Sequence, residues 1–248
     1  MRGVPLAFAR EAIVGGRVMM TRDNQKHHTK HQLSDFDAVS LYPSSQSIPE
    51  GYVQGTPKLF KDAIPTDADY YIARVRFDSI AKKRHFPLLS VFKAESDARN
   101  FTNDIVGKTM ILGKQALEDV VEFQGATYTV IEGRYWNDGF NDQICHTIRS
   151  LFAERLKLKM EGNPLQNGIK LLMNSAYGKL IQKPIIKQKT FVRNTSRDPN
   201  KIKEHTHKNI HKLITRTMVT EDLALFEEHK AVYDHWSPAH LGVQWERN

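Results

Sequence analysis

The sequence has little cysteine and no long apolar run. Its 248 residues include one cysteine, Cys145, which excludes an internal disulfide framework and a metal site built from cysteines alone. Such sparing use of cysteine is typical of a reducing compartment. No segment approaches the roughly 18 consecutive apolar residues of a membrane span, and residues 1–22 lack the pattern of a signal peptide. These absences indicate an intracellular protein without a membrane partner.

Composition and charge indicate a globular chain with a polyanionic partner. Hydrophobic residues make up 40% and charged residues 26% of the sequence, and its length fits one large domain or two modest ones. The formal net charge is +8, and the segment from Lys170 to Arg216 contains 12 basic and 2 acidic residues. This concentration predicts binding to nucleic acid, because each neutralised phosphate releases counterions. A solvated, mobile loop is the alternative.

Alternation and turn residues predict the elements of the first half of the chain. Residues 33–43 predict a short strand that ends in a turn near Pro43. Strands are also expected at Tyr70–Phe77 and Thr127–Ile131, with a short helix at Gln115–Phe123 between them.

A helical hairpin is the strongest structural prediction. Apolar residues recur at about 100° per residue from Asn141 until Gly162-Asn163-Pro164 breaks the helix. A second helix follows, with Pro164 near its first turn, and runs to about Gln182. Two helices joined by so tight a turn are expected to be antiparallel neighbours.

Polar residues on this hairpin are hard to explain as packing. Arg155 and Lys159 are one helical turn apart and fall within the apolar stripe of the first helix. Lys170, Asn174 and Tyr177 share one face of the second helix. Because an unpaired cation facing a core is costly, an anion such as a triphosphate is expected to meet them. Alternatively, the long basic side chains extend to water.

Asp37 is a candidate ligand for Mg²⁺. It follows a strand-like run and precedes a turn, where a carboxylate lies beside free backbone groups. A lone aspartate at such a place can equally be a turn or cap residue.

Two motifs resemble those of a known enzyme family. Asp37-Ala38-Val39-Ser40-Leu41-Tyr42-Pro43-Ser44 resembles motif A of the family B DNA polymerases, and Lys170-Leu171-Leu172-Met173-Asn174-Ser175-Ala176-Tyr177-Gly178 resembles their motif B. Both motifs occur in the right order. Between them lie Arg155 and Lys159, which are similar to the basic pair on the first fingers helix of this family. The chain therefore resembles a DNA-directed DNA polymerase, a nucleotidyltransferase that acts in DNA replication.

The resemblance implies roles for individual residues. Asp37 and Val39 are the implied metal-binding positions for two Mg²⁺ ions, and Asp37 is the implied catalytic residue. Tyr42 is expected under the sugar, where it excludes a 2′-hydroxyl. Primer-template DNA and a deoxynucleoside triphosphate are the implied partners. The implied nucleotide-binding residues are Ser40, Leu41, Tyr42, Arg155, Lys159, Lys170, Asn174 and Tyr177.

A finer resemblance points to the protein-primed branch of viruses, phages and linear plasmids. Ile13-Val14-Gly15-Gly16 is similar to the Y-x-G-G motif, which binds template in that branch, with Ile13 in place of the aromatic residue. A terminal protein primer is a further implied partner, and the host cytoplasm or nucleus is the implied location. The implied DNA-binding residues are Gly15, Gly16, Arg17, Ser175, Gly178, Lys179 and Lys183.

The expected fold class is α+β, an incomplete polymerase palm with an antiparallel sheet and helices, plus helical-hairpin fingers. Five parts are expected: a template-binding linker and palm entry (1–32), palm with motif A (33–83), a palm insertion similar to the terminal-protein region (84–137), fingers with motif B (138–183), and a basic insertion with truncated palm (184–248).

The second aspartate pair of the family, motif C, is missing. Asp67-Ala68-Asp69 has the spacing but lies before motif B, and Asp234 has no partner at that spacing. Nor is there room before Asp37 for an exonuclease domain. Because one carboxylate does not hold two Mg²⁺ ions, we expect a fragment that polymerises poorly or not at all by itself. One alternative is a noncatalytic nucleic-acid-binding remnant of a polymerase gene. The other is a nuclease or another nucleotidyl transferase, which would need clustered acidic residues.

Overall fold

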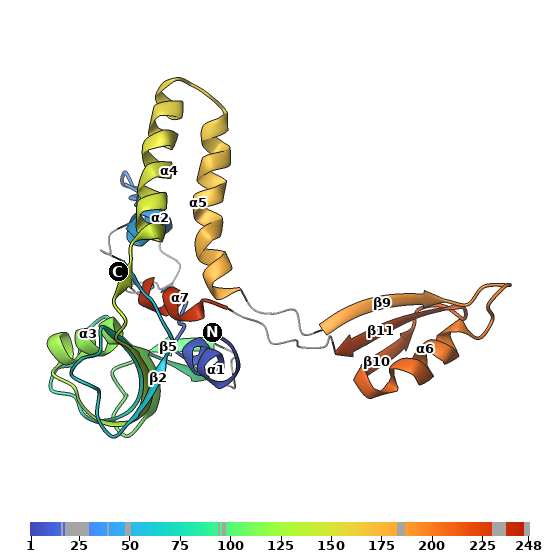
Figure 1. Cartoon of the computed structure of the whole chain (residues 1–248), viewed down its shortest axis with the longest axis horizontal. Coiled ribbons are helices and arrows are strands. Elements are labelled where there is room, and N and C mark those ends of the chain that lie inside the picture. Colours follow the sequence, from blue (N-terminus) through green and yellow to red (C-terminus); the bar gives the residue numbers. More distant parts are fainter. Residues whose placement is uncertain are drawn as a thin grey trace. The chain divides into compact units, whose positions relative to one another are not determined.

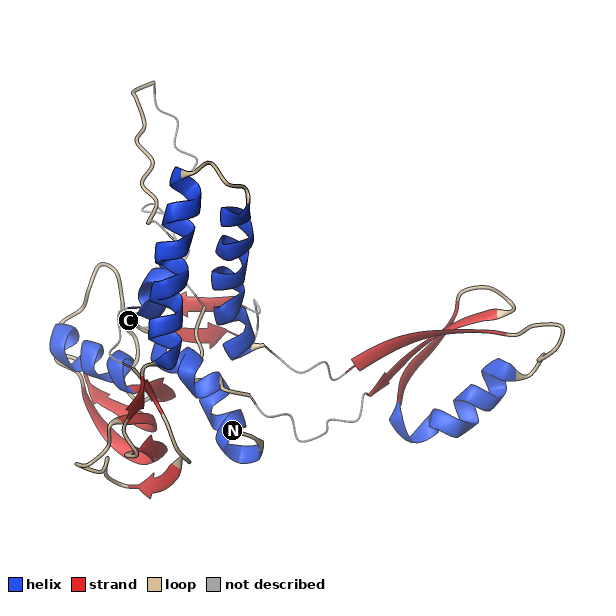
Figure 2. Cartoon of the chain, turned by 45° about the horizontal axis from the view of Figure 1, so that its top comes forward, coloured by secondary structure: helices blue, strands red, loops and turns tan. Residues whose placement is uncertain are grey.

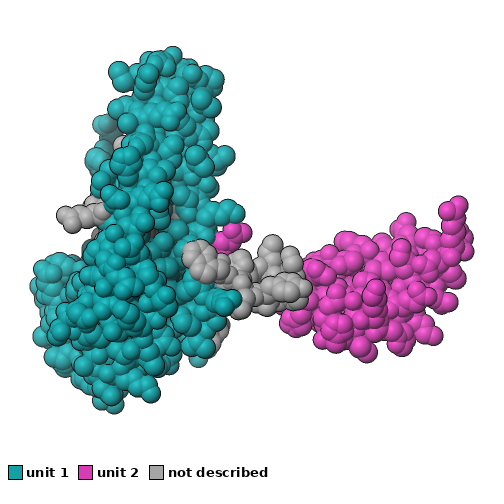
Figure 3. Space-filling view, viewed as in Figure 1, with its two compact units in different colours: residues 1–181, 237–248 teal, residues 182–236 magenta. Residues whose placement is uncertain are grey.

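The computed structural model divides into two compact units, which Figure 3 shows in different colours. Unit 1 consists of Met1–Ile181 and Ser237–Asn248, and unit 2 of Gln182–Trp236. The structure describes residues 1–15, 17, 30–38, 40–47, 51–93, 95, 98–182, 187–229 and 237–245.

Unit 1 is built on a four-stranded antiparallel sheet, shown among the strands of Figure 2. The alternation of the long third strand places its side chains on two faces. Tyr71, Ala73, Val75 and Phe77 pack in one cluster, while Tyr70 and Ile72 pack in another. The strand order is β2 (Lys58–Lys61), β7 (Thr127–Trp136), β3 (Tyr70–Ser79) and β6 (Thr109–Gly113).

Helices cover both faces of this sheet. α3 (Lys114–Gln124) packs through Ala116, Leu117 and Val120 on the first face. α1 (Gly3–Glu11) and α7 (Ala239–Trp245) contribute to the cluster on the second face. The strands predicted from Tyr70 and Thr127 and the helix predicted from Gln115 are confirmed.

Two short strand pairs complete the β-structure of unit 1. β1 (Tyr52–Val53) pairs with β8 (Phe140–Asn141), and β4 (Ser90–Lys93) pairs with β5 (Ala98–Phe101). All strand pairs within the described parts of the chain are antiparallel.

The predicted helical hairpin is confirmed, and its two helices lie side by side in Figures 1 and 2. α4 (Gln143–Met160) is followed by Gly162, whose φ of +68° favours glycine. The N–H groups of Gly162 and Asn163 donate to the carbonyls of Lys159 (3.2 Å) and Leu158 (2.9 Å). The side chain of Asn163 then accepts a hydrogen bond from the N–H of Leu165 at 3.0 Å, which begins α5 (Leu165–Ile181). The turn thus satisfies both helix ends within a few residues.

The strand predicted at residues 33–43 is wrong. Residues 33–38 form neither helix nor strand, and Leu33 and Phe36 are 79% and 91% exposed. The chain then enters a helix, α2 (Leu41–Ser47). Pro43 lies in its first turn, where proline is tolerated because the missing N–H has no helical acceptor there.

Unit 2 is a three-stranded antiparallel sheet with one helix on it. The buried side chains of Val192, Ala224 and Phe226 pack against Ile202 of the helix. The basic tract therefore folds into regular structure in its described residues. The elements are β9 (Lys187–Arg193), α6 (Lys201–Asn209), the 3₁₀ helix η2 (Ile210–Lys212), β10 (Leu213–Met218) and β11 (Leu223–His229), with the strand order β10-β11-β9.

A buried carboxylate joins the helix and sheet of unit 2. Glu228 is 1% exposed and accepts a hydrogen bond from Gln188 Nε2 at 3.0 Å. His205 Nε2 and Lys212 Nζ lie 2.8 Å and 3.4 Å from its oxygens. Burial raises the pKa of Glu228, but the hydrogen bonds from Gln188 and His205 and the charge of Lys212 outweigh it, so that its pKa lies below the usual value.

The fold class is the expected one, with antiparallel sheets, helices and a helical hairpin. No helix in the described ranges is long and apolar enough to cross a membrane. The five expected parts stay predictions. The four-stranded sheet contains strands from both sides of residue 84, and unit 2 begins at Gln182.

Candidate active site

The residues of motif A lie in and before α2. Asp37 is exposed, in the segment 30–38 that has no regular structure. Ser40 has a φ of +49°, a left-handed conformation that costs a non-glycine residue roughly 1–2 kcal/mol. Its carbonyl accepts a hydrogen bond from the N–H of Ser44 at 2.9 Å, so α2 starts directly from this strained turn. Leu41 and Tyr42, in the first turn, are 56% and 51% exposed. Motif A therefore presents accessible side chains around one strained residue.

Two arginines of α4 bind the two ends of α2. Arg155 Nη1 donates to Ser40 Oγ at 2.8 Å, and Arg149 Nε and Nη2 donate to the carbonyl of Ser47 at 2.9 Å and 2.7 Å. Six residues of helix rise about 9 Å, which matches the length of this short helix. A cation at the last carbonyl also interacts favourably with the helix dipole. α4 therefore fixes the position of α2, which lies beside it in Figure 1.

Motif B lies in the middle of α5. Ile169 and Met173 are buried against α4, in a cluster with Ile148. Lys170 and Asn174, which follow them by one residue each, are therefore exposed. Local helix packing orients these two polar residues toward solvent.

The basic residues of the hairpin differ in burial. Arg155 is partly buried, as its place in the apolar stripe predicts, whereas Lys159 is exposed. Arg155 Nε is buried and has no hydrogen-bond partner among the described residues. One guanidinium nitrogen therefore binds motif A while another is unsatisfied.

A cavity of about 660 Å³ lies at the base of the hairpin. Ser175 and Lys179 of α5 line it, together with apolar residues of α4, β1 and α7. Ser175 Oγ donates to the carbonyl of Leu172 at 2.8 Å. Gly178 is exposed, and a Cβ built on it would meet no atom within 4 Å. Ser175 and Lys179, two of the predicted DNA-binding residues, thus line one cavity. Asp37 and Lys170 are not part of its lining.

The remaining predicted residues are spread over the chain. Gly15 is exposed in the segment that follows α1, and the guanidinium of Arg17 lies 4.0 Å from the ring centroid of Phe101. Gly16, Val39 and Lys183 lie outside the described residues, as does the side chain of Tyr177.

The described residues do not fit a two-ion magnesium site. Within them, no group of three histidine, cysteine, aspartate or glutamate side chains could hold a metal. Mg²⁺ requires octahedral coordination by oxygen ligands, and Asp37 offers one exposed carboxylate. Asp67 and Asp69 accept hydrogen bonds from Asn137 Nδ2 (2.6 Å) and the N–H of Gly139 (2.8 Å), and so stabilise the loops of the sheet.

Sequence reasoning missed Arg149. It belongs to neither motif, and its acceptor, Ser47, is 102 residues away in the chain. A second arginine six residues before Arg155 on the same helix was the available signal, but periodicity alone does not identify the partner of a side chain.

Known structures with a similar fold are DNA polymerases. The chain is similar to the Phi29 DNA polymerase in complex with primer-template DNA and incoming nucleotides, with 17% identity and a TM-score of 0.53 over 85% of this chain and 32% of that one. An orthorhombic crystal form of the Phi29 enzyme gives 16% identity and a TM-score of 0.53 over 84% and 32%. The chain thus spans about a third of the length of the polymerases that it matches. These likenesses show the fold.

No curated protein matches the sequence. The family model for organellar and viral type B DNA polymerases matches residues 7–239, which include both motifs, the hairpin and unit 2. The chain therefore belongs to the organellar and viral type B DNA polymerases.

Proposed function

We propose that this chain forms the nucleotide-binding part of a DNA-directed DNA polymerase, which transfers deoxynucleotides from dNTPs to a primer 3′-hydroxyl. The observation that supports this most directly is the hydrogen bond between Arg155 Nη1 and Ser40 Oγ, 2.8 Å long. It joins a cationic helix of the hairpin to motif A. A nucleotide held by one of these segments therefore lies near the other.

The cationic side chains would neutralise the triphosphate. Phosphoryl transfer needs positioning and charge stabilisation rather than covalent help, and Lys159 and Lys170 are exposed cations on the two hairpin helices. Arg155 is well suited to exchange the Ser40 hydroxyl for a phosphate oxygen, because a phosphate carries the charge opposite to that of the guanidinium and can accept two parallel hydrogen bonds from it. Tyr42 would contact the sugar, and Asn174 and Tyr177 the nascent base pair.

Asp37 would contribute one carboxylate to the magnesium site. The described residues do not include the other ligands of this magnesium site. When bound, two Mg²⁺ ions would stabilise the attacking and leaving oxygens.

Nucleic acid is the second proposed partner. Gly15, Arg17, Ser175, Gly178 and Lys179 would contact primer-template DNA, and residues 84–137 a terminal protein primer. Unit 2 would help to encircle DNA. On its β9 strand, three cations and a phenylalanine alternate on the exposed side, although two of the cations have ion-pair partners within unit 2.

Calorimetric titration with dATP and Mg²⁺ tests the nucleotide site. Lys170→Ala and Lys159→Ala should each weaken binding about tenfold, because each removes a charge-assisted contact of roughly 1.5 kcal/mol or more. Lys157→Ala is the matched control, since Lys157 is an exposed cation of α4 outside the predicted set. Equal affinities for all three variants would contradict the proposal.

A primer-extension assay separates the fragment from a complete enzyme. We expect poor or no extension by these 248 residues, because no metal-holding cluster of carboxylates is found among the residues that the structure describes. A second candidate is a noncatalytic nucleic-acid-binding remnant, which needs the exposed cations of β9 and no metal. A remnant would bind DNA and would show no Mg²⁺-dependent binding of dATP.

A further inference from the structure

The β4–β5 hairpin presents aromatic and cationic side chains on one face. Phe92 is directly opposite Arg99, and Ser90 is opposite Phe101. Paired residues, and residues two apart on a strand, point to the same side of an antiparallel pair. Arg17 lies over the ring of Phe101 at 4.0 Å, whereas Phe92 is 52% exposed. The ring of Phe92 is therefore available to a ligand.

A groove of about 410 Å³ runs beside this face. Its lining includes Val14 from the segment after α1, Phe92 and Arg99 from the hairpin, and Lys108, which directly precedes β6. The volume falls in the range of roughly 300–1,000 Å³ that is typical of sites for small organic groups.

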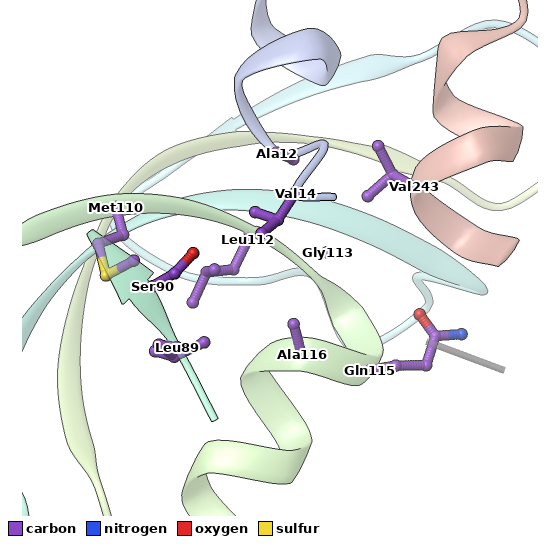
Figure 4. Close-up of a pocket in the computed structure, with 10 residues that line it drawn as sticks. All are labelled: Ala12, Val14, Leu89, Ser90, Met110, Leu112, Gly113, Gln115, Ala116 and Val243. Atoms are coloured by element: carbon purple, nitrogen blue, oxygen red, sulfur yellow. The ribbon is translucent and has the colours of Figure 1, made fainter. Parts of the chain in front are cut away.

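The floor of the groove is built by apolar packing. Val14, Ser90, Met110 and Leu112 line the groove and also a smaller neighbouring cavity, shown in Figure 4. In that view Val14 and Leu112 lie close together, next to the hydroxyl of Ser90. The segment that leads to Gly15 is therefore packed against the sheet at the edge of the groove.

We propose that this groove binds an unpaired strand of DNA, with a base stacked on Phe92 and phosphates beside Arg99 and Lys108. An exposed aromatic ring flanked by cations is the combination that binds single strands without sequence preference. In a duplex the bases are already stacked within the helix, so that Phe92 selects an unpaired base.

Charge sets the orientation of the strand. Glu11 lines the same groove and repels phosphates. The sugar-phosphate backbone of the bound strand therefore runs along Arg99 and Lys108 rather than along Glu11. Lys108 is paired with Asp104 at 3.6 Å, but that carboxylate is 86% exposed, and such surface pairs contribute little and exchange readily for phosphate.

This inference deepens the proposed function. The identification of the bound strand as the template rests on the proposed polymerase function. The groove extends the predicted DNA-binding site at Gly15 and Arg17 to the β4–β5 hairpin.

Fluorescence anisotropy with labelled oligo(dT) and with a duplex of the same length tests the proposal. Phe92→Ala should weaken single-strand binding at least about fivefold, since stacking is worth roughly 1–3 kcal/mol per base, and Phe92→Trp should retain it. Duplex binding should change less than about twofold. Phe123→Ala is the control, because Phe123 is 45% exposed on α3, outside the groove. Thermal melts of each variant check the fold.

Salt dependence tests the cations. The double variant Arg99→Ala, Lys108→Ala should reduce the slope of log Kd against log salt for oligo(dT) by about 1 to 2. The groove is excluded as the site if the chain binds oligo(dT) and Phe92→Ala binds like Phe123→Ala. The nucleotide site is tested separately by the dATP titration, so loss of dATP binding with intact Phe92-dependent DNA binding overturns the proposed function alone.

Discussion

The two segments that contain the polymerase motifs are held in place in different ways. Motif B lies within a long helix, and Ile169 and Met173 of that helix are buried against its neighbour. Motif A follows an exposed segment without regular structure, passes through the strained Ser40 and enters a helix of seven residues.

Motif B is thus positioned by residues close to it in the sequence, whereas motif A is positioned by residues far from it in the sequence. The polar residues of motif B are oriented by the helix to which they belong. Motif A depends on Arg149 and Arg155, which are 102 and 115 residues away from their acceptors in the chain. We therefore expect motif B to respond to core substitutions, and motif A to the loss of single hydrogen bonds.

The largest expected effect is in the core of the hairpin. Met173 is 1% exposed, so Met173→Ala should lower the free energy of unfolding by about 2–5 kcal/mol through lost burial and a residual cavity. Urea denaturation followed by fluorescence measures it. Leu171→Ala, at a site that is 71% exposed, should change stability by less than about 0.5 kcal/mol. Similar losses in both variants would show that burial of Met173 against α4 does not hold motif B in place.

A pH titration tests the buried layer beneath the hairpin. His240 of α7 stacks on Trp136, with ring centroids 5.2 Å apart. Burial lowers the pKa of His240 to about 3, and the charge of the Met1 amino group adds to the shift. The folded state therefore keeps the neutral imidazole, while the unfolded chain takes up a proton near pH 6.5.

Stability should thus be complete above pH 6.5 and fall as the pH is lowered toward 3. One bound proton corresponds to a loss of about 2 kcal/mol between pH 6.5 and pH 5. Urea titrations at a series of pH values measure the slope. His240→Phe keeps an aromatic ring on Trp136 and should flatten the dependence in this window; an unchanged slope in this variant would exclude His240 as its source.

Arg149→Gln should affect motif A alone. It removes two charge-assisted hydrogen bonds to the Ser47 carbonyl, and the amides of α2 should exchange about tenfold faster, which corresponds to about 1.4 kcal/mol of local stability. Hydrogen-exchange mass spectrometry of the peptide that contains residues 41–47 measures it. Exchange in α5 should be unchanged in this variant. In the control Lys157→Gln, exchange should be unchanged in both α2 and α5. Faster exchange in both helices would show that the two motifs are not independently held.

The smallest expected effect is at Ser40. Ser40→Ala loses the hydroxyl contact with Arg155 and keeps the positive φ, whereas Ser40→Gly loses the contact and relieves the strain. The glycine variant should be more stable than the alanine variant by about 1 kcal/mol, measured by urea denaturation. If the alanine variant is equally stable, the turn before α2 is not strained in solution.

Much of unit 1 could be predicted because its elements depend on nearby residues. The hairpin follows from a regular apolar period and from Gly162-Asn163-Pro164, whose turn satisfies both helix ends. The strand predicted at residues 33–43 was wrong because, within the described part of the chain, no strand pairs with this segment, and because the short α2 depends on contacts from α4. The motif residues were predicted by resemblance. Arg149 and Phe92 were not, since their positions depend on contacts between elements that are distant in the chain.

The position of α7 has a practical consequence. The chain leaves unit 1 after Ile181 and returns at Ser237, and Ser237 Oγ donates to the carbonyl of Leu180 at 3.5 Å. Exit and re-entry are thus neighbours within unit 1, so that the loop-closure cost of replacing the intervening 55-residue unit by a short turn is small. Unit 2 is therefore suited to replacement by another small unit, through which the proposed contacts with DNA could be engineered while the proposed nucleotide site is left unchanged.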